Sequence, residues 1–322
     1  MPAYSHPQIL ISKCLGFSPC RYDGKMISFL AANVLKPYVS FITVCPECEI
    51  GLGVPRKPIR IVLERGEFGE KETLIQPATE LDLTETMADF TAAYLDKLGS
   101  VDGAILKSKS PSCGIGNTKV FAYASNRDCL HRRGTGLFAE GLTGHFPYLP
   151  VVDEEQLLDS AMRDHFLTRI FALASFREVA ESGKMHKLVE YHTRNKLLLM
   201  AYDKEAMTMM GDIAANHVKR PFGEVVQEYG RYLRKMLSRP AGTGPNINVL
   251  MHAAGYFSDS LDPDEKALLE DRFREYRQKD AVLGELKKMF MSWILRYDVE
   301  YLLKQTYFCP YPEELSGSLR QV

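Results

Sequence analysis

The sequence lacks any apolar run of the roughly 18 residues that a membrane-spanning helix needs. Its first residues, Met1 to Gln8, also lack the basic segment and the apolar core of a secretory signal. The formal net charge of −1 gives no overall sign of a nucleic-acid partner. These absences predict a cytoplasmic protein that does not bind a membrane. Its 322 residues are enough for a buried core and for two domains.

Common short motifs are incomplete in this chain. Gly114-Ile-Gly116 and Gly134-Thr-Gly136 each begin a dinucleotide fingerprint, but neither completes G-x-G-x-x-G after a strand. We therefore expect no nicotinamide or flavin cofactor. The compact C-x2-C-x2-C spacing of ferredoxins is also missing. Cys45 and Cys48 form a single C-x2-C pair, which leaves a dithiol redox motif or half of a zinc site as alternatives.

The pattern of apolar residues predicts an α/β domain followed by an all-α domain. Up to about residue 150, short apolar runs alternate with Gly/Pro-rich loops, which is typical of a Rossmann-like, mostly parallel sheet. We expect strands at Ile9–Ser12, Ser40–Val44, Ile59–Leu63, Gly103–Lys107 and Leu149–Val152, and a helix at Asp82–Leu98. Further helices are expected at 154–181, 184–202, 204–217, 221–238, 246–258, 263–279 and 285–305. The predicted domains are 1–153, catalytic, and 154–322, helical.

One helix start is well defined by its residue types. Asp262 can cap the helix, Pro263 suits its first position, and Glu265 completes an arrangement like a capping box.

Three cysteines share one setting, in the loop just after an apolar, strand-like run. They are Cys14, Cys45 and Cys113. Loops at the carboxyl ends of neighbouring parallel strands meet in one crevice, so these thiols can converge there. Thiolates select zinc, copper(I) or iron-sulfur clusters, and a cluster held by only three of them leaves one iron open. Cys20, Cys129 and Cys309 are interpreted as small hydrophobic residues.

The cysteines lie in recognisable motifs. These are Cys14-Leu-Gly with Cys20-Arg21-Tyr22-Asp23-Gly24, Cys45-Pro46-Glu47 with Gly51-Leu-Gly-Val-Pro55-Arg56, and Lys107-Ser-Lys-Ser110-Pro111-Ser112-Cys113-Gly114. Together they resemble the thiouracil desulfidase family. Later segments, His186-Lys187-Leu188, Asn246-Ile-Asn248-Val-Leu-Met-His252 and Gln305-Thr-Tyr307-Phe-Cys-Pro310-Tyr311-Pro312, resemble the helical domain that is fused to this enzyme in tRNA 4-thiouridine desulfidases.

The resemblance implies a 4Fe-4S cluster held by Cys14, Cys45 and Cys113, and catalytic roles for Glu47 and Ser110. It implies replacement of C=S by C=O without net redox change. Cys48 departs from the family pattern, and we favour Cys45 as the ligand because it stands directly at the strand end. Two alternatives stay open: Glu47 pairs with Arg21 or Arg56, and Ser110 caps a turn. Arg21 either contacts substrate or holds the first ligand loop through Asp23.

A basic stretch in the second half favours tRNA as the partner. Residues 184–239 hold eleven Lys and Arg against six Asp and Glu. Lys187, Tyr191 and Arg194 fall on one face of one expected helix, and Arg231, Arg234 and Lys235 cluster on another. We expect these cations to contact tRNA phosphates, although such charge runs are often only solvated faces. The alternatives are a desulfidase of free thiouracil, and a non-enzymatic zinc-binding or redox-sensing RNA-binding protein.

Overall fold

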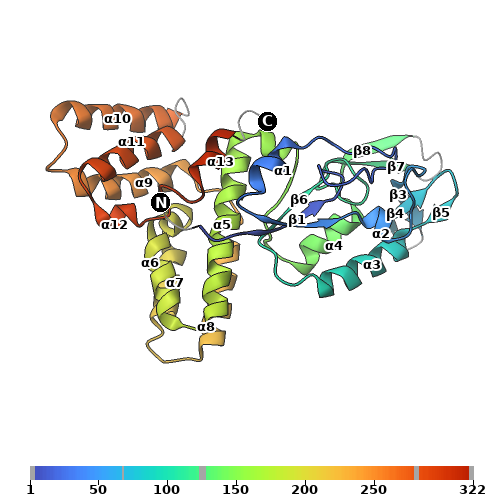
Figure 1. Ribbon diagram of the computed structural model, residues 1–322, viewed down its shortest axis with the longest axis horizontal. Coiled ribbons are helices and arrows are strands. Elements are labelled where there is room, and N and C mark those ends of the chain that lie inside the picture. The colour runs from blue at the N-terminus through green and yellow to red at the C-terminus, as the bar shows by residue number, and fades with distance from the viewer. Residues whose placement is uncertain (1–3, 67–68, 123–127, 279–282, 319–322) are drawn as a thin grey trace. The chain divides into compact units, whose positions relative to one another are not determined.

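The computed structural model describes residues 4–66, 69–122, 128–278 and 283–318 (Figure 1). The chain divides into two compact units. The first contains Ser5–Ala174 and the segment that begins at Glu313, and the second contains Ser175–Pro312. The first is an α/β unit built on a parallel sheet and the second is helical, as the sequence predicted. The roles predicted for the two domains stay predictions.

A four-stranded parallel sheet forms the centre of the first unit. Its order is β2 (Ser40–Val44), β1 (Gln8–Ser12), β6 (Gly103–Leu106) and β9 (Val151–Asp153). Every pairing in it is parallel, so all four carboxyl ends lie at one edge. Strand β1 lies inside the sheet, and Ile9, Leu10 and Ile11 are fully buried, which explains its unbroken apolar sequence. The expected strands at these four places are confirmed within two residues.

The strand expected at Ile59–Leu63 belongs to a different sheet. This second sheet has the order β5 (Leu81–Asp82), β4 (Gly69–Gln76), β3 (Arg60–Gly66), β7 (Thr118–Ala122) and β8 (Cys129–Gly134). Strand β3 runs antiparallel to β4 and parallel to β7. The sequence did not predict the other four strands, because much of β4 and β8 is exposed and carries charged side chains.

Helices cover the sheets of the first unit. They are α1 (Leu30–Leu35), α2 (Pro46–Glu49), α3 (Thr84–Lys97), α4 (Leu137–His145), the short 3-10 helix η1 (Gln156–Leu158), α5 (Ser160–Ser182) and α13 (Glu313–Ser318). Helices α3 and α4 lie side by side in Figure 1, and Met87 of α3 and Phe138 of α4 share one core with Leu10. Helix α5 packs closely on β6, because a Cβ at Gly103 would stand 2.7 Å from the Ile170 side chain. The single helix expected at 154–181 is thus η1 followed by α5, which continues past residue 174 into the second unit.

The second unit consists of α6 (Met185–Tyr202), α7 (Lys204–Ala215), α8 (Phe222–Met236), α9 (Thr243–Ala254), the 3-10 helix η2 (Gly255–Phe257), α10 (Pro263–Gln278), α11 (Leu283–Arg296) and α12 (Glu300–Leu303). The capping box is confirmed, since Asp262 Oδ1 accepts from the Glu265 N–H at 2.8 Å. The helix expected at 285–305 is instead two helices, because Asp298 adopts φ of 50° between them. None of the helices in the described ranges is both long and apolar enough to span a membrane.

Candidate active site

The three predicted cysteines lie just beyond the carboxyl ends of three adjacent strands. Cys14 follows β1, Cys45 follows β2 and leads into α2, and Cys113 is in the loop after β6. Because the strand order is β2-β1-β6, these loops are neighbours at one edge of the sheet. The Lys13 N–H donates to the Val44 carbonyl at 2.8 Å and so joins the first two loops. The sheet topology therefore places at one edge thiols that are about 30 to 100 residues apart in sequence.

Two further cysteines join this group. The Cys20 thiol interacts with Cys14 on one side and with Cys45 on the other. The Sγ atoms of Cys45 and Cys48 each lie 3.8 Å from the Cys20 carbonyl oxygen. Cys20 is 5% exposed, so it is buried as expected of a small hydrophobic residue, but it is buried among thiols. The sequence signal for this placement of Cys20 was its position six residues after Cys14, inside the first family motif.

Burial and neighbouring thiols raise the pKa of Cys20, Cys48 and Cys113. Burial raises the pKa of Cys113 to about 12, and burial together with the neighbouring Cys45 raises that of Cys48 to about 11. The hydrogen bond with Cys14, with burial, raises the pKa of Cys20 to about 11. Thiols so close together cannot all carry a negative charge at neutral pH unless a cation compensates. Such a group therefore fits a thiolate-binding metal centre, whose positive charge supplies that compensation.

The arrangement of the thiols bears on which kind of metal centre they could bind. Nowhere in the described residues do three His, Cys, Asp or Glu side chains form a ready group for one metal ion. The thiols come instead from three separate loops. In an iron-sulfur cluster each thiolate binds a different iron, so its ligands stand farther apart than those of one zinc ion. Cys14, Cys45 and Cys113 are the residues that would hold such a cluster.

Glu47 lies in the first turn of α2, where its carboxylate is held from two sides. Arg56 donates to Oε2 from Nε at 2.8 Å and from Nη2 at 2.6 Å. The Ser112 hydroxyl donates to Oε1 at 3.2 Å. Arg56 Nη1 also donates to the Cys20 carbonyl at 3.0 Å. The ion pair that the sequence left open is thus formed with Arg56, and the hydrogen bond from Ser112 joins Glu47 to the loop of Cys113.

Ser110 caps the turn that carries Cys113. Its Oγ accepts from the backbone N–H groups of Ser112 at 3.2 Å and of Cys113 at 3.1 Å. The turn-capping contact that was the structural alternative for Ser110 is therefore present. The Ser110 side chain also hydrogen-bonds the Cys113 thiol. The catalytic roles of Glu47 and Ser110 stay predictions.

The N-terminus of α4 fixes the Cys113 loop. Leu137 N–H donates to the Pro111 carbonyl at 3.2 Å, and Ala139 N–H donates to the Ser112 carbonyl at 3.1 Å. A Cβ at Gly136 would lie 2.4 Å from the Ser112 carbonyl carbon and 2.7 Å from the Cys113 nitrogen. The glycine set aside as part of an incomplete dinucleotide motif is therefore required by this close backbone contact.

A buried hydroxyl at the end of β1 also supports this loop. Ser12 is 2% exposed, its Oγ accepts from the Lys107 N–H at 2.9 Å, and its side chain hydrogen-bonds the Cys113 thiol. Sequence reasoning missed Ser12, since a serine at a strand end carries no signal of its own.

Arg21 lies in the loop after Cys14. Its guanidinium is 3.8 Å from the Asp23 carboxylate and stands over the Tyr22 ring at 5.7 Å. The contact expected of a loop-holding residue is thus present, and substrate binding by Arg21 stays a prediction.

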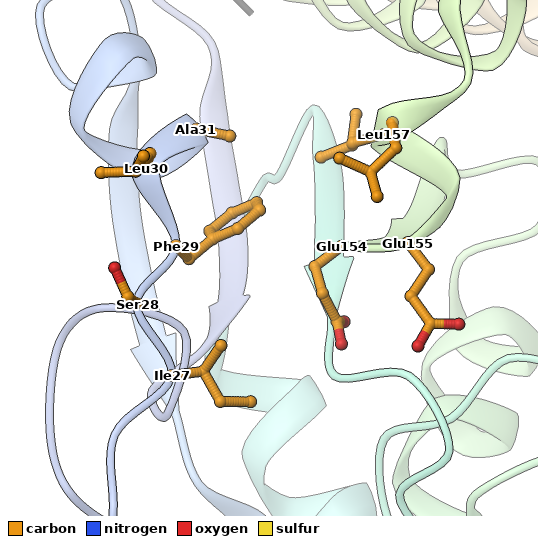
Figure 2. A pocket seen from close by; sticks show the side chains of 9 residues that line it. Ile27, Ser28, Phe29, Leu30, Ala31, Glu154, Glu155 and Leu157 are labelled. Carbon is orange, nitrogen blue, oxygen red and sulfur yellow. The ribbon is translucent and has the colours of Figure 1, made fainter. Parts of the chain in front are cut away.

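A hollow of about 260 Å³ adjoins the ligand loops (Figure 2). It is lined by Ile27, Ser28, Phe29, Leu30, Ala31, Glu154, Glu155, Leu157 and Leu158. The Ile27 N–H donates to the Cys14 carbonyl at 2.9 Å, and Glu154 forms an ion pair with Lys107 at the end of β6. The hollow therefore connects through backbone and ion-pair contacts to the loops of both Cys14 and Cys113.

The predicted RNA contacts all belong to the helical unit. Lys187 and Arg194 of α6 and Arg231, Arg234 and Lys235 of α8 have exposed side chains. Lys187 pairs with Glu190 at 3.2 Å, and Arg231 lies over Tyr232 at 5.1 Å. Tyr191 does not share the basic face as expected. It is 4% exposed and packs against Phe176 and Tyr229, because its ring fills the core between α6 and α8.

Comparison with known proteins shows which family the first unit matches. Residues 9–154 match the family model described as 2-thiouracil desulfurase, and residues 196–312 match a family described as a protein of unknown function, DUF1722. The chain is 36% identical over 112 residues to the uncharacterized protein YbbK of Bacillus subtilis, covering 34% of this chain and 74% of that protein. It is 28% identical over 155 residues to the uncharacterized protein YbgA of Escherichia coli, covering 48% of this chain and 92% of that protein.

A solved structure, described as the [4Fe-4S]-dependent thiouracil desulfidase TudS, is 27% identical and covers 47% of this chain and 93% of its own, with a TM-score of 0.35. The family model spans the ends of β1, β2 and β6 and includes all the cysteines at this edge of the sheet. The chain therefore belongs, through residues 9–154, to the 2-thiouracil desulfurase family.

Proposed function

We propose that this chain converts 4-thiouridine in tRNA to uridine, with water supplying the oxygen and hydrogen sulfide as the second product. The observation that carries the proposal is that Cys14, Cys45 and Cys113 each follow one of three adjacent strands at one edge of the parallel sheet, where the Ser112 hydroxyl donates to Glu47. A 4Fe-4S cluster bound by these three thiolates would supply an iron without a protein ligand, a Lewis acid for the thione sulfur. The reaction exchanges S for O and needs no electron donor.

Glu47 would act on the water that replaces sulfur. Arg56 occupies Oε2 with two hydrogen bonds, so the carboxylate is held in one orientation. Oε1 accepts only the Ser112 hydroxyl among the described residues, and it has a lone pair left for water. A fixed carboxylate within hydrogen-bond reach of water is the arrangement that general-base catalysis requires.

Ser110 would bind the base rather than attack it. Its hydroxyl accepts two backbone N–H groups and hydrogen-bonds the Cys113 thiol, and once Cys113 holds the cluster it would donate to a ring or exocyclic atom of the pyrimidine. Donation to the developing negative charge on the base would favour addition of water to C4.

The helical unit supports tRNA as the substrate. A free base needs only a pocket, whereas a thiolated base inside a folded RNA must be reached or extruded while phosphates are held. Lys187, Arg194, Arg231, Arg234 and Lys235 are exposed cations on α6 and α8 that can meet phosphates. The second candidate substrate is free thiouracil, which the description of the matched family favours.

The test is a direct comparison of substrates. The full chain, purified and reconstituted with iron and sulfide under argon, is incubated with tRNA containing 4-thiouridine and, separately, with free 4-thiouracil. Loss of near-ultraviolet thione absorbance with matching sulfide release from tRNA is expected, and tRNA binding should weaken steeply with salt. Turnover of the free base alone would establish the second candidate. A colourless protein that binds zinc and turns over neither substrate would refute desulfuration altogether.

A further inference from the structure

A buried glutamine anchors the end of α12 to α6 in the helical unit. Gln305 is 3% exposed, and its side-chain amide donates to the Thr193 carbonyl at 2.9 Å and accepts from the Leu197 N–H at 3.1 Å. These two backbone groups are four residues apart and bond to each other in a regular helix. The next residue, Thr306, donates its N–H to the Arg194 carbonyl at 3.0 Å. The motif that begins at Gln305 therefore fixes the α12 segment at the turn of α6 that carries Arg194.

A second buried bond of the same motif anchors the segment to α9. The Tyr307 hydroxyl donates to Asn246 Oδ1 at 2.9 Å, and both residues are at most 2% exposed. Helix α9 runs directly into η2, which carries Tyr256. The rings of Tyr256 and Tyr301 are stacked, with centroids 5.4 Å apart and planes 18° from parallel. Tyr256 is 53% exposed, so this rigidly supported aromatic pair faces solvent.

A hollow of about 320 Å³ lies beside this pair and is lined by Glu190, Thr193, Arg194, Tyr301, Lys304 and Gln305. Two of its charges are already compensated. Glu190 pairs with Lys187 at 3.2 Å, and Lys304 pairs with Glu300 at 2.5 Å. The exposed Arg194 guanidinium has no hydrogen-bond or ion-pair partner among the residues that the structure describes. The lining of the hollow thus combines one ring of the aromatic pair, Tyr301, with one uncompensated cation.

An aromatic face next to an arginine matches the chemistry of a nucleotide. Bases stack on aromatic side chains irrespective of sequence, and a guanidinium binds phosphate with paired N–H donors. Because the other charges in the hollow are compensated, Arg194 is its single available positive charge. One positive charge suits one phosphate rather than an extended acidic surface. A size of roughly 300 Å³ is at the lower end of known small-molecule sites.

We propose that this hollow binds one unpaired nucleotide of the tRNA, with its base on the Tyr256–Tyr301 pair and its phosphate on Arg194. The inference rests on the proposed tRNA substrate and goes further by naming the contact in the helical unit.

The test measures binding of an unmodified tRNA transcript to the full chain by fluorescence anisotropy at several salt concentrations. Tyr256→Ala removes the exposed ring, Tyr256→Phe keeps it, and Arg194→Ala removes the cation. Arg272→Ala is the control, because Arg272 is an exposed arginine of α10 in the same unit, paired with Glu275. Circular dichroism and thermal melting establish that each variant folds.

Tyr256→Ala should weaken binding at least fivefold, the lower limit for loss of one stacked base, whereas Tyr256→Phe should bind like the wild type. Arg194→Ala should weaken binding and lower the salt slope by about one phosphate contact. If the wild type binds tRNA and both alanine variants bind equally well with an unchanged salt slope, this site is refuted and the proposed function stands. If the wild type binds no tRNA, both the site and the tRNA substrate are refuted, and free thiouracil remains as the substrate.

Discussion

Two hydrogen bonds from the Arg56 guanidinium end on the same oxygen of Glu47, at 2.8 Å from Nε and 2.6 Å from Nη2. The pair is largely removed from water, with exposed side-chain fractions of 6% for Arg56 and 14% for Glu47. Nη1 of the same guanidinium also donates to the Cys20 and Gly53 carbonyls. One cation therefore orients the proposed base and joins the loops on either side of it.

Replacing Glu47 by glutamine tests the base directly. An amide keeps the size of the carboxylate but cannot accept a proton, so Glu47→Gln should lower turnover roughly a hundredfold or more. The control is Glu49→Gln, an exposed carboxylate on the same helix. Iron content, measured for both variants, should equal that of the wild type. Full turnover by Glu47→Gln with a full cluster would remove Glu47 from the chemistry.

Two substitutions of Arg56 separate the contribution of its charge from that of its hydrogen-bond geometry. Lysine keeps the charge but has one nitrogen in place of the three that contact Glu47, Cys20 and Gly53, so Arg56→Lys should lower turnover roughly tenfold. Arg56→Ala leaves a buried carboxylate alone and should lower the free energy of unfolding by about 3–5 kcal/mol. Urea denaturation and steady-state rates measure the two effects. The matched control, Arg132→Lys on the exposed face of β8, should change neither quantity.

The sequence predicted the parts of this site that are encoded by strand ends. Cys14, Cys45 and Cys113 each follow an apolar run, and the run itself fixes the edge of the sheet where they emerge. Ser12 and Gly136 were not predicted, because their roles depend on contacts with loops distant in sequence. Tyr191 was misassigned for a similar reason, since helical spacing gives its face but not whether a neighbouring helix covers that face.

Most strands of the second sheet were not predicted, for a different physical reason. Its strand β4 begins with charged residues and shows alternating burial only near Leu74 and Gln76, so the period-two signal is short. The break at Asp298 was missed because the apolar spacing of α11 continues into α12, whereas the left-handed backbone at one residue leaves no periodic trace.

Substitutions at the five clustered cysteines should differ in their effect on iron binding. Serine at Cys14, Cys45 or Cys113 removes a thiolate that would hold the cluster, so reconstituted protein should lose its visible absorbance and most of its iron. Cys129→Ser, on the exposed β8, should retain both. Cys20→Ala and Cys48→Ala test the remaining thiols and should retain iron. If Cys20→Ala lost its iron and Cys14→Ser retained it, Cys20 would be the cluster ligand in place of Cys14.

The stability of the α/β unit should depend on pH through His165. Burial, with the nearby Arg169 cation, lowers the pKa of His165 to about 4. The unfolded chain then binds a proton near pH 6.5 that the folded chain does not, so stability falls as pH decreases from about 6.5 to 4. The urea midpoint, measured across this window, should fall less for His165→Gln than for the wild type. Parallel pH profiles for the two proteins would contradict this assignment.

Gly136 gives the sharpest test of how the Cys113 loop is held. A methyl group there would overlap the backbone of Ser112 and Cys113, at 2.4 Å and 2.7 Å, and backbone atoms packed under α4 cannot yield as a flexible side chain does. Gly136→Ala should therefore displace the loop, reduce iron uptake and lower turnover. Gly144→Ala is the matched control, in the helix that Gly136 caps, because nothing lies within 4 Å of its Cβ position.

The two glycine variants should also differ in their free energy of unfolding. Alanine favours helix over glycine by up to about 1 kcal/mol, so Gly144→Ala should be neutral or slightly stabilising in urea denaturation. Gly136→Ala should be destabilised because the close contact between α4 and the loop is lost. Since the two substitutions add the same methyl group at the N-cap and near the end of one helix, equal iron content in the two variants would show that the Cys113 loop does not depend on α4 for its position.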